Sequence, residues 1–207
     1  MMKNWMWQLK RWKNQAMPNI FEGLKGRHIE MSNSKTGPIN GVFVKELKIH
    51  PDKIDPGKQI FRPGALAEVW RNDLADSPLI VAQATFTYAY AGTVKAFHRH
   101  QIQYDIWFPA TGKMVVILRD LRPNSLTFLN TMVIEAGWES WKRIVIPPGV
   151  GHGYKVVSAE PAILFYLVTE TYNPSDELRY DENDHNQRFD WNSIPLEITS
   201  AKEADAK

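Results

Sequence analysis

Residues 92–112, GTVKAFHRHQIQYDIWFPATG, carry the strongest structural signal in the chain. β-branched and aromatic residues fill both halves of this stretch and glycines bound it, which predicts two strands joined by a bend. Side chains alternate across a strand, so His98 and His100 are expected on the same face. Asp105 follows beyond the bend and can return to that face. The stretch therefore predicts a polar cluster inside a β-rich protein.

A second stretch, residues 146–153 (IPPGVGHG), enters a Pro/Gly turn that presents His152. Together the two stretches resemble the signature motifs of the cupin superfamily, G-x5-H-x-H-x4-E-x6-G and P-x-G-x-x-H. Asp105 stands at the Glu position of the first motif, and Val156 replaces the Asn that ends the second. The resemblance implies a jelly-roll barrel.

The remaining chain fits this fold class. Short β-branched or aromatic runs recur between Val42 and Tyr172, separated by Gly, Pro, Asn and Asp, with no helical pattern between them. We therefore predict an all-β jelly-roll (cupin) barrel with short N- and C-terminal arms. The cupin domain with its C-terminal arm is expected over residues 39–207, and an N-terminal extension over residues 1–38.

The extension begins with a tryptophan-rich and basic segment. Trp5, Leu9 and Trp12 recur at helical spacing, which predicts a short basic amphipathic helix followed by a linker. Such a helix can lie on a membrane surface, or it can cap the fold or contact a second copy. The first 17 residues contain no uninterrupted apolar stretch of the kind found in secretory signals, so we expect a cytoplasmic protein.

Composition excludes several functional classes. The 207 residues include no cysteine, which rules out disulfides, thiolate zinc sites and cysteine nucleophiles. A net charge of +2, from 25 basic and 23 acidic residues, does not resemble that of a nucleic-acid-binding protein. No apolar run is long enough to predict a transmembrane segment.

Two interpretations of the histidine motifs follow from the residues alone. His98, His100, Asp105 and His152 can bind a metal ion, since imidazole and carboxylate suit manganese, iron, nickel or zinc. Alternatively, they hydrogen-bond to one another within a polar barrel.

A narrower resemblance covers residues 39–203, which are similar to the dTDP-4-dehydrorhamnose 3,5-epimerases and related nucleotide-sugar epimerases. Gln83 stands 15 residues before His98, as the corresponding Gln does in that family. The other matching segments are collinear with the family: 41–47, 68–71 (EVWR), 94–98 (VKAFH), 120–128 (DLRPNSLTF), 146–154 (IPPGVGHGY), 166–174 (YLVTETYNP) and 190–191 (DW).

The resemblance implies proton abstraction and return at C3, C5 or both, beside the C4 ketone of a dTDP-4-keto-6-deoxy sugar or related sugar nucleotide. This chemistry needs a base, a group that stabilises the enolate, and an acid on the other face of the sugar. The resemblance implies His98 as base, Tyr166 as acid and Glu203 as the residue that orients His98. It further implies a homodimer formed through N-terminal strands and no cofactor. The implied substrate contacts are Gln83, Lys95, Arg71, Arg99, His152 and Glu68.

Two departures from the family pattern keep other functions open. Asp105 aligns with the family lysine thought to steady the enolate, which removes a favourable electrostatic interaction. Pro63-Gly64 stands where an arginine is expected, with Arg62 alongside. Two alternatives to the epimerase function are therefore a metal-dependent cupin enzyme and a catalytically inactive carbohydrate-binding cupin. One imidazole cannot readily serve as both base and metal ligand, so the metal-dependent and His98-base mechanisms are rivals.

Overall fold

The computed structural model describes residues 35–52, 64–71, 73, 79–180 and 189–197. These residues form thirteen β-strands and one 3-10 helix, η1 (Trp191–Ser193). The predicted N-terminal helix and the predicted orienting residue Glu203 lie outside the described residues. Within the described residues, no helix is long and apolar enough to cross a membrane.

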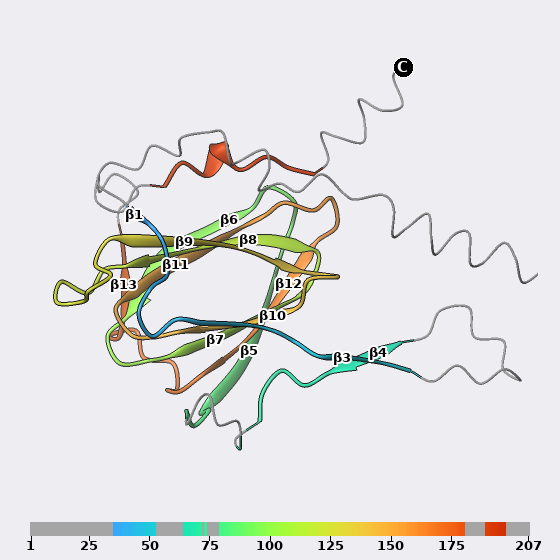
Figure 1. The fold of residues 1–207 in the computed structure, drawn as a ribbon, viewed down its shortest axis with the longest axis horizontal. Coiled ribbons are helices and arrows are strands. Elements are labelled where there is room, and N and C mark those ends of the chain that lie inside the picture. The colour runs from blue at the N-terminus through green and yellow to red at the C-terminus, as the bar shows by residue number, and fades with distance from the viewer. Residues whose placement is uncertain (1–34, 53–63, 72, 74–78, 181–188, 198–207) are drawn as a thin grey trace, which may run out of the picture. The chain divides into compact units, whose positions relative to one another are not determined.

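Eleven of the strands form two sheets that face each other (Figure 1). The first sheet contains, in spatial order, β1 (Lys35–Thr36), β9 (Asn130–Gly137), β8 (Lys113–Asp120), β11 (Val150–Val156), β6 (Val94–His100) and β13 (Glu177–Arg179). The second contains β2 (Phe43–Glu46), β10 (Lys142–Ile146), β7 (Asp105–Thr111), β12 (Ala162–Val168) and β5 (Gln83–Ala89). Only the β1–β9 pair is parallel among these described strands. A separate hairpin joins β3 (Ile49–Pro51) to β4 (Ala65–Ala67).

The hydrophobic core fills the space between the two sheets. Met114, Val116 and Leu118 alternate along β8 and point into the core, where they pack with residues such as Ile144 and Leu164 of the facing sheet. Each such side chain stabilises the fold by roughly 1.5–3 kcal/mol through burial. This apolar part of the sandwich holds the two sheets apart and so supports the polar cavity described below.

The outer side of the six-stranded sheet is covered by the C-terminal segment 189–197. Lys155, which points outward from β11, donates hydrogen bonds of 2.7 Å to the carbonyl oxygens of Trp191 and Ile194. The Trp191 ring also packs against Phe97 of β6, with ring centroids 5.7 Å apart. The segment thereby holds β6 and β11, the two strands that carry the histidines.

The structure confirms the predicted all-β jelly-roll class, although the two sheets do not close into a continuous barrel. The run SLTFLNTMVI (125–134) is one of the stretches for which the sequence predicts a strand, but β9 begins only at Asn130 because residues 125–128 form a turn. The hydroxyls of Ser125 and Thr127 donate to Asp120, and Leu129 takes a positive φ of 65° before β9 starts. The short strands β1, β4 and β13 were not expected, and β1 falls within the range predicted for the extension.

Candidate active site

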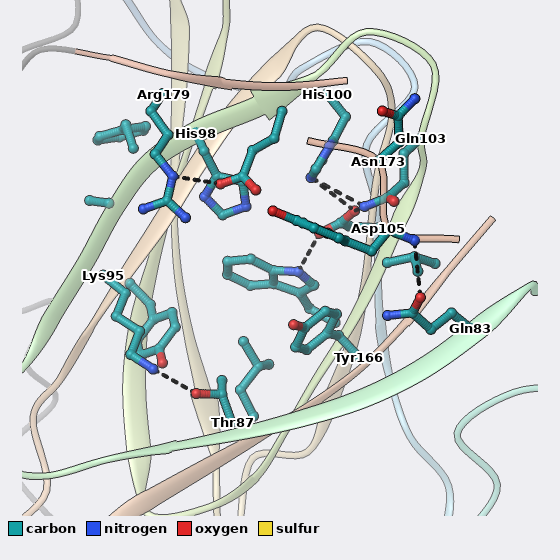
Figure 2. A pocket seen from close by; sticks show the side chains of 18 of the residues that line it. Gln83, Thr87, Lys95, His98, His100, Gln103, Asp105, Tyr166, Asn173 and Arg179 are labelled. Carbon is teal, nitrogen blue, oxygen red and sulfur yellow. Dashed lines mark hydrogen bonds and ion pairs between the residues drawn. The ribbon is translucent and has the colours of Figure 1, made fainter. Parts of the chain in front are cut away.

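A polar cavity of about 670 Å³ lies between the sheets, at the end that the apolar core does not fill. Its walls come from β5, β7 and β12 on one side and from β6, β11 and β13 on the other (Figure 2). This volume is within the range of small-molecule sites in proteins.

Four predicted residues come together at one wall of the cavity. His98 and His100 lie on the same face of β6, and His152 of the neighbouring strand β11 is paired directly with His98. Asp105 begins β7 in the facing sheet. One ligand-type atom from each of the four lies within 4.8 Å of all the others. The prediction that these four side chains converge is confirmed.

A glycine allows His152 to approach β6 so closely. A Cβ atom at Gly153 would lie 2.6 Å from the Cβ of Ala96, so a larger residue would push the strands apart. The register between β11 and β6 also shifts between His152 and Tyr154. This local irregularity aims His152 at His98.

Hydrogen bonds determine which nitrogen of each ring carries a proton. His152 Nδ1 lies 3.0 Å from the carbonyl oxygen of Val150, which can only accept, so Nδ1 is protonated. The neutral ring then has its lone pair on Nε2, which lies 2.9 Å from His98 Nε2. His98 must therefore donate through Nε2 and hold its own lone pair on Nδ1. This tautomer leaves His98 with a nitrogen able to accept a proton.

The same reasoning applies to His100. Gln103 Nε2 donates to Asp105 Oδ1 at 2.7 Å and lies 3.2 Å from His100 Nε2, to which it also donates. His100 Nε2 therefore carries a lone pair, and Nδ1 carries the proton and faces Asp176 Oδ2 at 3.4 Å. Asp176 is itself held by the backbone N–H groups of residues 101–103, which donate to its carboxylate.

Asp105 is nearly inaccessible and lies beside the lone pairs of two imidazoles. Its Oδ2 accepts from the indole nitrogen of Trp107 at 3.0 Å and lies 3.5 Å from His152 Nε2. Its Oδ1 lies 3.7 Å from His100 Nε2. Three groups that accept hydrogen bonds thus converge on one small space.

Burial keeps the paired histidines neutral. Burial, with a smaller contribution from the neighbouring His152, lowers the pKa of His98 to about 3, although Asp105 opposes the shift. Burial likewise lowers the pKa of His152 to about 3, although its bond to the Val150 carbonyl opposes this shift. Both rings are therefore neutral at pH 7, with the His152 lone pair accepting from His98 and the His98 lone pair on Nδ1.

Three further predicted residues line the same cavity. Tyr166 extends from β12 in the sheet opposite His98, and its pKa is raised by burial and by the negative charges of Asp105 and Glu177. Lys95 donates through Nζ to Thr87 at 2.6 Å, and Gln83 accepts from the backbone of Tyr172 at 3.1 Å. Tyr166 therefore remains a protonated phenol, and Lys95 places a positive charge at the wall.

Two predicted substrate contacts do not line this cavity. Arg71 is exposed and pairs with Asp73 at 2.6 Å and with Glu68 at 3.5 Å. Arg99 alternates with His98 along β6 and so points to the other face, where it lies over the Tyr180 ring.

Two more predicted residues have other positions. Glu68 belongs to the exposed pair with Arg71 and does not line the cavity. His152 is only 1% exposed and lies behind His98, where it contacts that ring and does not line the cavity.

Two charged residues of the cavity, Glu177 and Arg179, were not predicted from the sequence. Both lie on β13, which pairs with β6 so that Glu177 is opposite His100 and Arg179 opposite His98. Because they are two residues apart in the sequence, their side chains lie on the same face of β13. The segment around them is polar and has no β-branched or aromatic pattern that predicts a strand. Arg179 donates to Glu177 at 2.8 Å.

The fold and the cavity together define a cupin-like jelly-roll protein with a polar small-molecule site between its sheets. Within this class, the chain belongs to the dTDP-4-dehydrorhamnose 3,5-epimerase family, whose model matches residues 28–207. Members of this family are isomerases.

Two relatives support this assignment, and solved structures share the fold. The chain is 38% identical over 159 residues to the spore coat polysaccharide biosynthesis protein SpsL of Bacillus subtilis, covering 75% of this chain and 97% of SpsL. It is 31% identical over 160 residues to the probable low-salt glycan biosynthesis epimerase Agl13 of Haloferax volcanii, covering 75% and 96%. A dTDP sugar isomerase from Desulfovibrio desulfuricans has the same fold, with a TM-score of 0.67, 20% identity, and coverage of 76% of this chain and 95% of that one.

A further solved structure contains a sugar nucleotide. It is a dTDP-6-deoxy-D-glucose-3,5-epimerase from Legionella pneumophila in complex with dTDP-4-keto-L-rhamnose. This structure matches with a TM-score of 0.64 and 23% identity, covering 82% of this chain and 90% of that one.

Proposed function

We propose that this protein is a sugar nucleotide epimerase that inverts C3, C5 or both beside the C4 ketone of a dTDP-4-keto-6-deoxy sugar or a related nucleoside diphosphate sugar. One observation carries the proposal: a neutral imidazole and a protonated phenol line one cavity from opposite sheets. A sugar ring between the sheets would present one face to His98 and the other to Tyr166. Inversion of a carbon requires this arrangement of base and acid.

The proposed reaction has two proton transfers. His98 Nδ1 takes the proton beside the ketone, and the electrons of the broken C–H bond move onto the ketone oxygen as an enolate. Tyr166 then returns a proton to the opposite face of the same carbon. Positioned acids and bases of this kind typically accelerate such steps by about 10²–10⁴-fold.

The low pKa of His98 affects how this base operates. An imidazole with a pKa of about 3 is fully available at pH 7, but it binds a proton weakly. A diphosphate bound in the same cavity would bring negative charge that favours the protonated ring and would raise this pKa. We therefore expect His98 to become an effective base in the substrate complex.

Positive charge for the enolate or the diphosphate is proposed to come from residues other than the family lysine. Lys95 and Arg179 both line the cavity, and Gln83 adds an amide at its wall. Arg71, Arg99 and Glu68 remain predicted substrate contacts, although they do not line the cavity of a single chain. Glu203 remains the predicted orienting residue, and the hydrogen bond from His98 to His152 is a second means of orientation.

We further propose that the protein acts in the cytoplasm as a homodimer. Phe86, Tyr88 and Tyr90 are 59–67% exposed and lie along or just beyond β5, which is an edge strand of its sheet. An apolar edge of this kind is suited to association with a second copy. Light scattering should give twice the chain mass, and Phe86→Asp should shift it toward the monomer. A monomeric wild-type protein would contradict this assembly.

The proposed reaction can be tested by NMR in D₂O with a dTDP-4-keto-6-deoxy sugar. The wild-type protein should introduce deuterium at C3, C5 or both, and form an epimer. Tyr166→Phe should still exchange deuterium but form the epimer about 10²-fold more slowly, because only the returning proton is affected. Tyr104→Phe, a matched change at a tyrosine that does not line the cavity, should behave as the wild type.

The alternatives give different results in this experiment. Binding of the sugar nucleotide without any exchange would contradict the epimerase function and favour an inactive carbohydrate-binding cupin. Equal loss of exchange and epimer formation in Tyr166→Phe would contradict its role as the second-face acid.

A further inference from the structure

The space between His98, His100, Asp105 and His152 is bordered mainly by atoms that carry lone pairs. His152 Nε2 and His100 Nε2 lie 3.5 and 3.7 Å from the Asp105 carboxylate oxygens. Each of these nitrogens accepts one hydrogen bond, His152 from His98 and His100 from Gln103. Within the cluster, the only proton on these four side chains that faces inward is the one His98 shares with His152. In the metal-free cluster the N–H groups of His98, Gln103 and Trp107 compensate these acceptors. A cation bound among them would compensate the same atoms more strongly.

The distances also suit a metal ion. Ligand atoms bound to one ion at about 2.0–2.2 Å lie roughly 3–3.5 Å from each other. The separation of 2.9 Å between His98 Nε2 and His152 Nε2, and of 3.5 Å between His152 Nε2 and Asp105 Oδ2, fall near this range. His100 Nε2 and Asp105 Oδ1 are 3.7 Å apart, and all four ligand atoms lie within 4.8 Å of one another, so the wider pairs must close by up to about an ångström around an ion.

Groups outside the cluster orient the imidazoles in the manner typical of metal-binding histidines, whose second nitrogen donates to a carbonyl or carboxylate. His152 Nδ1 donates to the Val150 carbonyl at 3.0 Å, and His100 Nδ1 faces the Asp176 carboxylate at 3.4 Å. Asp176 is fixed in turn by three backbone N–H groups. Both Nε2 atoms are thereby held with their lone pairs toward the cluster.

We propose that His98, His100, Asp105 and His152 bind one divalent first-row transition metal ion, and that this ion and base catalysis by His98 exclude each other. Three imidazoles and one carboxylate suit manganese, iron, cobalt, nickel or zinc better than magnesium or calcium. The ion would lie at the cavity wall, since three of the four residues line the cavity.

The exclusion follows from the protons on His98 and rests on the proposed function. In the metal-free cluster, His98 Nε2 carries the proton and Nδ1 the lone pair. Coordination through Nε2 uses that nitrogen's lone pair, so the proton of the neutral ring must move to Nδ1. His98 then has no lone pair left to take a proton from a substrate.

The metal site is tested without any substrate. Untagged full-length protein is stripped with EDTA and titrated with Co²⁺, while the visible absorption of the bound ion is recorded and its stoichiometry is measured by elemental analysis after dialysis. We expect one ion per chain. His100→Ala and Asp105→Asn should each weaken binding by at least about 100-fold, and Asp176→Asn by about 10–100-fold.

A matched control uses a histidine outside the cluster. His50 is exposed on β3, so His50→Ala should bind Co²⁺ as the wild type does. Thermal unfolding of each variant shows whether weaker binding reflects loss of the fold. No bound ion in the folded wild-type protein, or binding unchanged in both His100→Ala and Asp105→Asn, would overturn the proposed site.

The exclusion is tested by deuterium exchange into the sugar nucleotide at increasing Co²⁺ occupancy. Exchange should fall in proportion to the fraction of protein with bound ion, and EDTA should restore it. Exchange that is unchanged or faster in the loaded protein would overturn the exclusion. A metal-free protein that also shows no exchange would instead contradict the proposed epimerase function and the role of His98 as base, on which the exclusion rests. The metal-binding result would still stand.

Discussion

Asp105 and Asp120 are both buried carboxylates in strands of this sandwich, yet their surroundings are opposite. Asp120 accepts hydrogen bonds from the guanidinium and backbone of Arg122 and from the hydroxyls of Ser125 and Thr127. Among the described residues, Asp105 accepts from Gln103 and Trp107, and its oxygens lie 3.7 and 3.5 Å from the nitrogens of the neutral imidazoles of His100 and His152.

This difference distinguishes a carboxylate that stabilises the fold from one that is available for chemistry. Donors surround Asp120 on every side, so its charge is compensated within the protein. Asp105 keeps part of its charge uncompensated next to a cavity, which is typical of binding and catalytic sites. The two regions should therefore respond differently to the same substitutions.

The largest expected effect is on activity and lies in the histidine cluster. His98→Asn should lower the rate of deuterium exchange into the sugar nucleotide by about 10²–10⁴-fold, because the proposed base is lost. The control variant His50→Asn changes an exposed histidine and should retain the full rate. Full activity in the His98→Asn variant would contradict the proposal that His98 is the catalytic base.

The same change at both carboxylates should give opposite results for stability. Asp120→Asn should lower the free energy of unfolding by about 3 kcal/mol, because the buried carboxylate loses its charged hydrogen bonds from the half-buried Arg122. Asp105→Asn should change it by less than about 1 kcal/mol, since removal of a buried charge that has no cationic partner offsets the weaker hydrogen bonds from Gln103 and Trp107. Both values can be measured by urea denaturation at pH 7.

The stability comparison has a clear contradicting outcome. A larger loss for Asp105→Asn than for Asp120→Asn would mean that the histidine cluster stabilises the fold and that the two regions are not distinguished as proposed.

The two regions should also differ in acid. Burial raises the pKa of Asp120, but the hydrogen bonds from Arg122, Ser125 and Thr127 outweigh it and lower this pKa from 3.8 to about 2. Because the folded-state pKa is lowered, the stabilisation is complete above pH 3.8 and is lost as the pH falls toward 2.

Denaturation curves between pH 5 and pH 2 test this dependence. The wild-type protein should lose stability over the lower part of this range, and Asp120→Asn should lose less, because residue 120 no longer titrates. An identical loss in both proteins would show that other groups cause the acid sensitivity.

The fold and most of the cluster could be predicted from sequence because they depend on local patterns. Alternation along β6 places His98 and His100 on one face, and the Pro/Gly turn before His152 limits where that residue can point. The motif spacing then indicated that Asp105 joins them. The expected strands agree with the structure wherever β-branched residues are dense.

The rest of the site depends on pairing that local patterns do not specify. Glu177 and Arg179 reach the cavity only because the short polar strand β13 pairs with β6. Asp176 likewise reaches His100 through backbone N–H groups of residues 101–103, which are distant in sequence. Arg71 and Glu68 match family positions in sequence, but they pair with each other away from the cavity.

The smallest expected effects come from removing one donor at each carboxylate. Thr127→Val removes one hydroxyl from Asp120, which keeps its bonds to Arg122, so the free energy of unfolding should fall by only about 1 kcal/mol.

Gln103→Ala removes the amide that donates to both Asp105 and His100. Because this amide competes with a cation for those two acceptors, Gln103→Ala should tighten Co²⁺ binding a few-fold in the absorption titration. Weaker binding in that variant would mean that Gln103 supports the metal site, and that donors and cations do not compete for Asp105.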